Sequence, residues 1–248
     1  MKNLQDEIKS AFVSFSDAWK TEQATITNEL DKSSEDYLAS YMRLVSLNAW
    51  REHLLSGILS KGSLEFFFEA QNDALVSHVF ARQGAWRSAL QSLRACIEDV
   101  VFGLYYKDHP VELAQWQIGR HKPSCVKLLE YLAANPLFVG INGATTGLAA
   151  LSAEYSTLSR AVHGGESFRM TAGGGSTNLW SSAKSSLGAW LTRERHTICA
   201  LNLVLLTMFR EHLDGMKLPV LRKAVSLAVP PAKHAQVKQD LHIVLFKP

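Results

Sequence analysis

The chain of 248 residues contains no proline before Pro110, and only 4 of its 15 glycines precede that position. All 7 prolines lie at or after it. Proline interrupts helices and sheets and glycine weakens both, so a long stretch almost without them is typical of continuous helix. This distribution excludes an all-β, a collagen-like and a disordered chain, and it predicts a nearly uninterrupted helical block over residues 1–109.

Cysteine, charge of one sign and long hydrophobic runs are scarce as well. The 3 cysteines are far apart and form no Cys-x-x-Cys, which favours free thiols in a reducing compartment. A formal net charge of +3 is too small to indicate nucleic-acid or membrane binding by itself. The longest apolar run, residues 198–209, is shorter than the roughly 20 residues that span a bilayer, and residues 1–7 lack the apolar core of a signal peptide. We therefore expect a soluble cytoplasmic protein.

The motifs of several common catalytic sites are missing too. Two segments are rich in glycine, residues 140–147 and 173–177, and neither ends in the Gly-Lys-Ser/Thr of a phosphate loop. No His-Glu-x-x-His zinc motif occurs. No Gly-x-Ser-x-Gly nucleophile elbow is present. The sequence therefore predicts neither a metal nor a cofactor.

What is present is helical periodicity, and it predicts an all-α fold. Apolar residues from Leu4 to Leu30 keep helical spacing and form a narrow stripe that needs a partner. Ser33 and Asp36 form a variant capping box for a second helix that ends at Gly62, and Ser63 is the expected cap of the third. The later helices are expected over residues 64–82, 86–106, 111–118, 124–134, 148–163 and 182–213. A tail follows, in which residues 241–246 form a short strand or a docking segment.

Two helices carry polar side chains along one face. Arg87, Arg94 and Glu98 share a face of the helix over residues 86–106, which is either solvated surface or one wall of a site. Tyr155, Ser159 and His163 are spaced by four and four on the helix over residues 148–163.

His163 ends that helix just before two glycines, where the helix dipole favours a protonated imidazole. This position suits acid–base chemistry, and it also suits a plain C-terminal cap. The glycine-rich residues 164–180 that follow are the expected position of a flexible cover over a binding cleft.

The order of these motifs resembles the HEPN superfamily. The motifs are Gly-Ala-Trp-Arg-Ser-Ala-Leu at 84–90, Leu-Arg-x-x-Ile-Glu at 93–98, and Tyr-x-x-Leu-Ser-x-x-Val-His-Gly at 155–164. The resemblance covers roughly residues 64–212. It implies a HEPN-like helical bundle over residues 63–214, with an N-terminal helical hairpin over residues 1–62 and a short C-terminal tail over residues 215–248 packed on the bundle.

The resemblance also implies a function. Members of the superfamily act in bacterial anti-phage, abortive-infection and toxin–antitoxin systems, often as homodimers, and active members cleave RNA without a metal through an Arg and a His. RNA, or a partner protein of a defence system, is the implied ligand.

The catalytic residues implied for this chain are His163, Arg160, Arg94 and Glu98, and the binding residues implied are Tyr155, Ser159 and Arg87. The imidazole transfers the proton and the guanidinium stabilises the phosphate charge. Leu158 stands where the family has its arginine, so the guanidinium comes from Arg160 or Arg94.

Two interpretations remain open at this stage. In the first, the protein is an endoribonuclease that uses His163. In the second, Arg94, Glu98, Tyr155, Ser159 and His163 form an internal hydrogen-bond network, and the protein is a non-catalytic helical module that binds a partner protein or nucleic acid.

Overall fold

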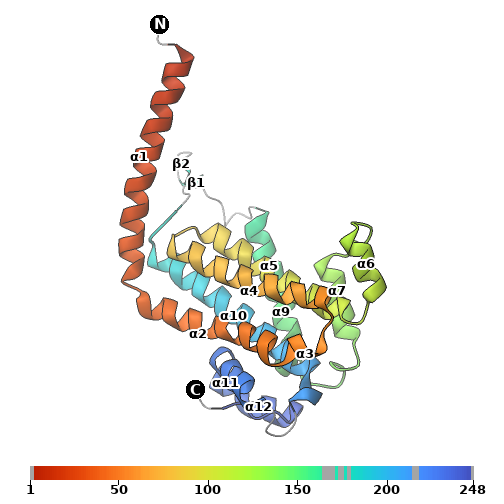
Figure 1. Ribbon diagram of the computed structural model, residues 1–248. Coiled ribbons are helices and arrows are strands. Elements are labelled where there is room, and N and C mark those ends of the chain that lie inside the picture. The colour runs from red at the N-terminus through yellow and green to blue at the C-terminus, as the bar shows by residue number, and fades with distance from the viewer. Residues whose placement is uncertain (1–2, 164–170, 173–175, 178–179, 214–217, 247–248) are drawn as a thin grey trace.

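The computed structural model describes residues 3–163, 171–172, 176–177, 180–213 and 218–246. The predicted all-α class is confirmed for these residues, which contain one short hairpin besides the helices (Figure 1). The longer helices are α1 (Leu4–Asp31), α2 (Ser34–Trp50), α4 (Lys61–Arg82), α5 (Trp86–Tyr106), α6 (Pro110–Gln117), α7 (Cys125–Ala134), α9 (Leu148–Val162), α10 (Lys184–Met208), α11 (Pro219–Ala228) and α12 (Pro231–Leu241). The shorter ones are a π-helical segment (Arg51–Leu55), α3 (Ser56–Ile58), α8 (Gly143–Thr146) and a 3₁₀ turn (Arg210–His212).

Helices α4, α5, α9 and α10 form the centre of the structure. The hairpin of α4 and α5 is the most extensive helix pair, and α9 and α10 pack against α5 and against each other (Figure 1). Helix α2 lies across α4, α10 and α11. One hydrophobic core runs from Ile26 to Leu245, so the three predicted segments of the chain share a single core.

Two glycines permit close approaches in this core. Gly103 on α5 faces the ring of Phe67 on α4, where an added Cβ would lie 2.6 Å from a ring carbon. Gly147, with φ of +71°, starts α9, and its Cβ would lie 2.8 Å from the carbonyl oxygen of Ala200 on α10. A side chain at Gly147 would be strained by both the backbone angle and the contact.

The predicted N-terminal hairpin is wrong. Helix α1 leaves the body at a steep angle to α2 instead of lying beside it (Figure 1). Only Ile26 and Leu30 of α1 are buried, and α1 contacts α4 near its C-terminal end. Helix α2 buries residues on more than one face, including Trp50, and it therefore belongs to the core rather than to an extension.

The N-terminal caps of α2 and α4 differ from the predicted ones. Ser33 precedes α2, but its side chain makes no capping hydrogen bond. The run that begins with α2 ends at Ile58, before Gly62, because Ser60 adopts an extended conformation and accepts a hydrogen bond from the amide of Ser63 at 3.3 Å. Ser60 is thus the cap of α4, and Ser63 is buried inside the helix.

The predicted short tail is a pair of helices. Pro219 and Pro231 each occupy the first turn of a helix, where the missing amide proton costs nothing, so they start α11 and α12 rather than breaking structure. The segment after α12 has no regular secondary structure and docks on the body: Ile243 and Leu245 are buried, and Arg222 on α11 donates from Nε to the carbonyl oxygen of Val244 at 2.8 Å.

The glycine-rich cover predicted over residues 164–180 lies mostly outside the described residues. Within it, β1 (Thr171–Ala172) pairs with β2 (Ser176–Thr177) in antiparallel register. Trp180, at the end of this segment, contacts Trp19 of α1 with ring centroids 6.2 Å apart. Among the described helices none is both long enough and apolar enough to cross a bilayer.

Candidate functional site

The predicted polar faces of α5 and α9 meet each other. Arg94 on α5 donates from Nε to the hydroxyl of Ser159 at 3.1 Å and from Nη2 to Tyr155 Oη at 2.9 Å. The same Nη2 forms an ion pair with Glu98 Oε1 at 2.7 Å. The polar stripe on α5 is therefore an inter-helical contact and not solvated surface.

Tyr155 completes this network. Its hydroxyl donates to Glu98 Oε1 at 2.9 Å, and the Arg94 guanidinium lies 5.1 Å from the centre of its ring. Burial, followed by the charge of Glu98, raises the pKa of Tyr155, which therefore stays protonated as a donor. The buried Cys125 of α7 lies beside these groups, and burial raises the pKa of its thiol to about 12. Such a thiol is not a nucleophile near neutral pH.

Arg87 is predicted as a binding residue, but it contacts the C-terminal end of α9. It is the second residue of α5 and donates from Nε to the carbonyl oxygen of Ala161 at 3.0 Å and from Nη2 to that of Val162 at 2.8 Å. These carbonyls belong to the last turn of α9, whose acceptors have no partner within the helix. Arg87 therefore caps α9 and fixes the position of the residue that follows it, His163.

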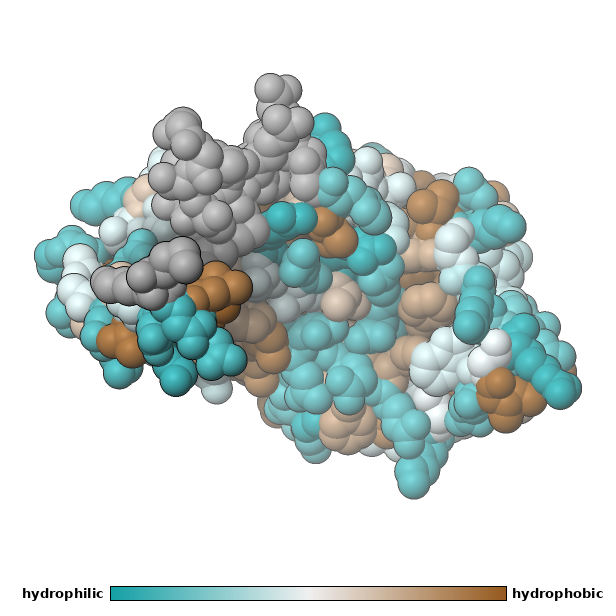
Figure 2. All heavy atoms as spheres, turned by 90° about the horizontal axis from the view of Figure 1, so that it is seen from above, coloured by the Kyte–Doolittle hydropathy of each residue, from teal (hydrophilic) through white to brown (hydrophobic). Residues whose placement is uncertain are grey.

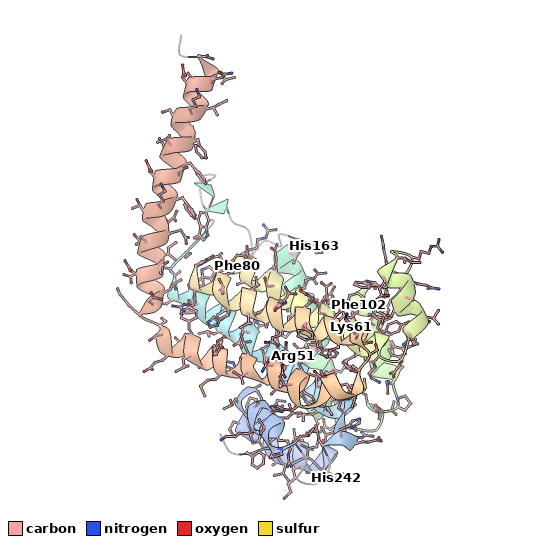
Figure 3. All side chains as sticks on the ribbon, in the orientation of Figure 1. Arg51, Lys61, Phe80, Phe102, His163 and His242 are labelled. Carbon is pink, nitrogen blue, oxygen red and sulfur yellow. The ribbon has the colours of Figure 1, made fainter. Side chains whose placement is uncertain are left out.

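His163 lies at the end of α9, on the side of the bundle that carries the hairpin (Figure 3). Its backbone amide donates to the carbonyl oxygen of Ser159, and its side chain is exposed. Within the described part of the chain the imidazole makes no hydrogen bond, so His163 does not belong to the internal network that the second interpretation assigns to it.

The exposed imidazole borders a surface hollow of about 570 Å³ on the outer side of α9. Most of its lining comes from polar side chains of that helix. The lining residues are Val126, Ser152, Tyr155, Ser156, Ser159, Arg160 and His163. Among the described residues, Arg160 donates only to the hydroxyl of Thr157, at 3.3 Å, and its side chain is open to solvent.

The two arginines therefore differ in what they can do. The guanidinium of Arg94 is committed to Glu98, Tyr155 and Ser159, beneath the hollow, and it holds the wall in place. Arg160 and His163 are free to turn toward a ligand in the hollow. Hydroxyl donors beside a guanidinium and an imidazole suit an anionic ligand such as a phosphodiester.

Sequence reasoning missed Ser152 and Ser156. With Ser159 and His163 they follow spacings of four, three and four, which is one helical face, so the pattern was visible in the sequence. Serine is common on exposed helical surface, and only the hollow distinguishes this face from an ordinary one.

On its other side α9 is tied to α10 by a buried carboxylate. Glu154 accepts from Arg193 Nη1 at 2.9 Å and contacts His196 Nδ1 at 3.1 Å. The side chain of Glu154 is only 8% exposed, so both partners offset the cost of burying it. Helix α9 is thus held by hydrogen bonds from α5 on one side and by an ion pair with α10 on the other.

A pair of carboxyl groups joins α4 to α5 near the network. Asp73 and Asp99 share a hydrogen bond, and burial, followed by the charge of Asp73, raises the pKa of Asp99 to about 7. Two carboxylates in contact cannot both ionise at low cost, so the pair holds a proton over part of the neutral range.

The described residues contain no group of three or more His, Cys, Asp or Glu side chains placed to hold a metal ion. In comparisons with known proteins, the chain matches no family model, no curated protein and no solved structure. Any function must therefore be argued from the geometry of the hollow and of the network beneath it.

Proposed function

We propose that the protein binds RNA in the hollow beside His163 and cleaves it without a metal, as a HEPN-like effector of a bacterial anti-phage or toxin–antitoxin system. The observation that carries this proposal is the hollow itself, in which an exposed imidazole, an exposed guanidinium and several hydroxyls converge on one helical face. The class of system comes from the resemblance of the helix motifs alone.

The chemistry assigned to each residue follows from its exposure. The imidazole of His163 takes the proton of a ribose 2′-hydroxyl; the 2′-oxygen then forms a bond to phosphorus, and the bond from phosphorus to the 5′-oxygen breaks. The leaving 5′-oxygen takes a proton from the imidazolium or from water. Arg160 stabilises the charge on the phosphate oxygens. Arg94, Glu98 and Arg87 are positioning residues, because their hydrogen bonds lie within the protein.

The test is cleavage of a labelled single-stranded RNA in the presence of a metal chelator. His163→Ala should abolish cleavage, and Arg160→Ala should lower the rate about 10²-fold or more, as the loss of a charge-stabilising donor does. His53→Ala is the matched control, since His53 is an exposed helical histidine far from the hollow in the chain. A His163→Ala protein that folds and cleaves at the wild-type rate would refute the assignment.

A second candidate function is binding without cleavage. It is favoured by the commitment of Arg94 to intramolecular bonds and by Leu158 at the position of the family's arginine. In this case wild-type protein retards RNA in a gel but leaves it intact, and Arg160→Ala weakens that binding. If the wild-type protein neither cleaves nor binds RNA, the ligand of the hollow is a partner protein.

A further inference from the structure

Helix α1 carries a hydrophobic face that is buried at one end and exposed at the other. Ile26 and Leu30, near its C-terminal end, are 4% and 2% exposed and belong to the core. The remaining large side chains of this face, which we call the α1 stripe, are exposed by 41% to 68%. The α1 stripe consists of Leu4, Ile8, Phe12, Phe15 and Trp19.

The buried and the exposed parts follow one repeat. The pairs Leu4–Ile8, Phe15–Trp19 and Ile26–Leu30 recur every 11 residues. A repeat of 11 residues corresponds to about 3.67 per turn, close to that of a straight helix, so all three pairs lie on the same face. The body buries only the last pair, and α1 projects beyond it (Figure 1). Trp19 contacts Trp180 on one side but stays 41% exposed, and Leu4, Ile8 and Phe15 are exposed by 57% or more. Figure 2, which looks at α1 from its N-terminal end, shows hydrophobic residues exposed beside that end.

The charge of the projecting part disfavours a membrane or a nucleic acid as its partner. Residues 4–22 contain four carboxylates and two lysines, a net charge of −2. Helices that lie on anionic membranes are rich in Lys and Arg on their polar face, and nucleic acids attract the same residues. An apolar protein surface therefore fits the α1 stripe better than either of these.

We propose that this surface is the α1 stripe of a second copy of the chain, with the two helices antiparallel. In that arrangement Leu4 lies opposite Trp19 of the other copy, Ile8 lies opposite Phe15, and Phe12 lies opposite Phe12. The stripe is thus complementary to itself about Phe12, as a two-fold interface requires.

The body of the protein excludes a parallel arrangement. The face of α1 that holds the stripe is also the face that packs on α4 through Ile26 and Leu30. A parallel second helix laid on this face would run into the body beyond Trp19. An antiparallel helix ends there, and its own body lies beyond the N-terminal end of the first helix.

The area is sufficient for a specific contact. An aromatic side chain offers roughly 150–250 Å², and Leu and Ile offer less, so these five, exposed by 41–68%, leave up to about 600 Å² per chain. Two copies together bury up to about 1,200 Å², which reaches the lower end of the range for specific interfaces. The largest apolar patch on a typical monomer reaches about 300–600 Å² and is often functional.

The first test is the mass of the full chain in solution, measured by light scattering between about 1 and 100 μM, the range in which an interface of this size assembles. We expect wild-type protein to approach twice 27.5 kDa. The double variant Ile8→Glu/Phe15→Glu should stay at the single-chain mass throughout. The matched control is Val13→Glu, because Val13 is 57% exposed on the same helix but on another face. The control should dimerise as wild type does.

Cysteine cross-linking then tests the direction of the helices. The three native cysteines are buried, so an introduced cysteine on the α1 stripe is the reactive one. Phe12→Cys should oxidise to a linked dimer, and a mixture of Ile8→Cys with Phe15→Cys should link the two different chains. Ile8→Cys alone should link much less.

Three outcomes would overturn the proposal. The first is a wild-type chain that remains at the single-chain mass up to 100 μM, whether or not it binds lipid vesicles or another protein. The second is a dimer that survives Ile8→Glu/Phe15→Glu. The third is rapid linking of Ile8→Cys to itself, which would require parallel helices.

Discussion

Removal of the Glu98 carboxylate tests whether the network between α5 and α9 stabilises the fold. Glu98 Oε1 accepts from Arg94 at 2.7 Å and from Tyr155 at 2.9 Å, and its side chain is 24% exposed. Hydrogen bonds to charged groups contribute about 1.5–3 kcal/mol each, and partial exposure lowers that value, because water replaces part of what is lost. We therefore expect Glu98→Ala to lower the free energy of unfolding by about 2 kcal/mol. At about 2–4 °C per kcal/mol for a chain of this size, the melting temperature falls by about 4–8 °C.

The assay is thermal unfolding followed by circular dichroism, with variants that separate the two bonds. Tyr155→Phe removes the bond to Glu98 together with the one that Tyr155 Oη accepts from Arg94. The double variant Glu98→Ala/Tyr155→Phe should show a coupling of about 1 kcal/mol, as residues in direct contact do. The matched control is Glu130→Ala, an exposed helical glutamate whose loss should shift melting by no more than about 1–2 °C. His163→Ala should also melt like wild type, since its imidazole is exposed. Equal melting of Glu98→Ala and Glu130→Ala would refute the reasoning.

Three further variants probe other parts of the fold. The pKa of Asp99 is about 7 in the folded protein against 3.8 for the free side chain. The protonated carboxyl group therefore contributes its full share of the free energy of unfolding below about pH 4, and this share is lost as the pH rises through 7. Asp99→Asn should melt higher than wild type at pH 8 and should flatten the fall in melting temperature between pH 5 and 8. Gly147→Ala should lower the free energy of unfolding, measured by denaturant titration, by at least about 2 kcal/mol, because a left-handed backbone and a contact with α10 both oppose the added carbon. A melting temperature within 1 °C of wild type would contradict this. Arg222→Met should release the segment around Val244, seen as faster amide hydrogen exchange there, while Lys223→Met, which changes an exposed neighbour, should not.

The sequence predicts the helices well where their limits depend on local chemistry, and poorly where they depend on packing. The limits of α5 follow from Gly84 and from the Asp-His-Pro at 108–110, and the predicted range, residues 86–106, matches the structure. Ser63 and Ser60 are equally good caps by type, and only the extended backbone at Ser60 decides between them. Proline at a helix start and proline in a loop also look alike in sequence, which explains why α11 and α12 were missed.

The candidate site shows the same division. Helical spacing alone places Tyr155, Ser159 and His163 on one face of α9, and the structure keeps them there. Tertiary packing decides which helix faces these residues, and the packing of α5 against α9 decides the roles of the arginines. Arg94 and Arg87 lie on one face of α5, yet the first braces the wall of the hollow and the second caps α9.

The hollow and the α1 stripe are separate features, and this separation makes the two proposals informative about each other. The stripe lies on α1, which contacts α4, whereas the hollow is built from α9 with one residue of α7. A chain kept monomeric by Ile8→Glu/Phe15→Glu therefore retains every residue of the hollow. If that variant still cleaves or binds RNA, the hollow acts alone and α1 serves assembly. If activity is lost while melting of the body is unchanged, the second copy must complete the site, and Arg160 and His163 of one chain are not sufficient for the reaction.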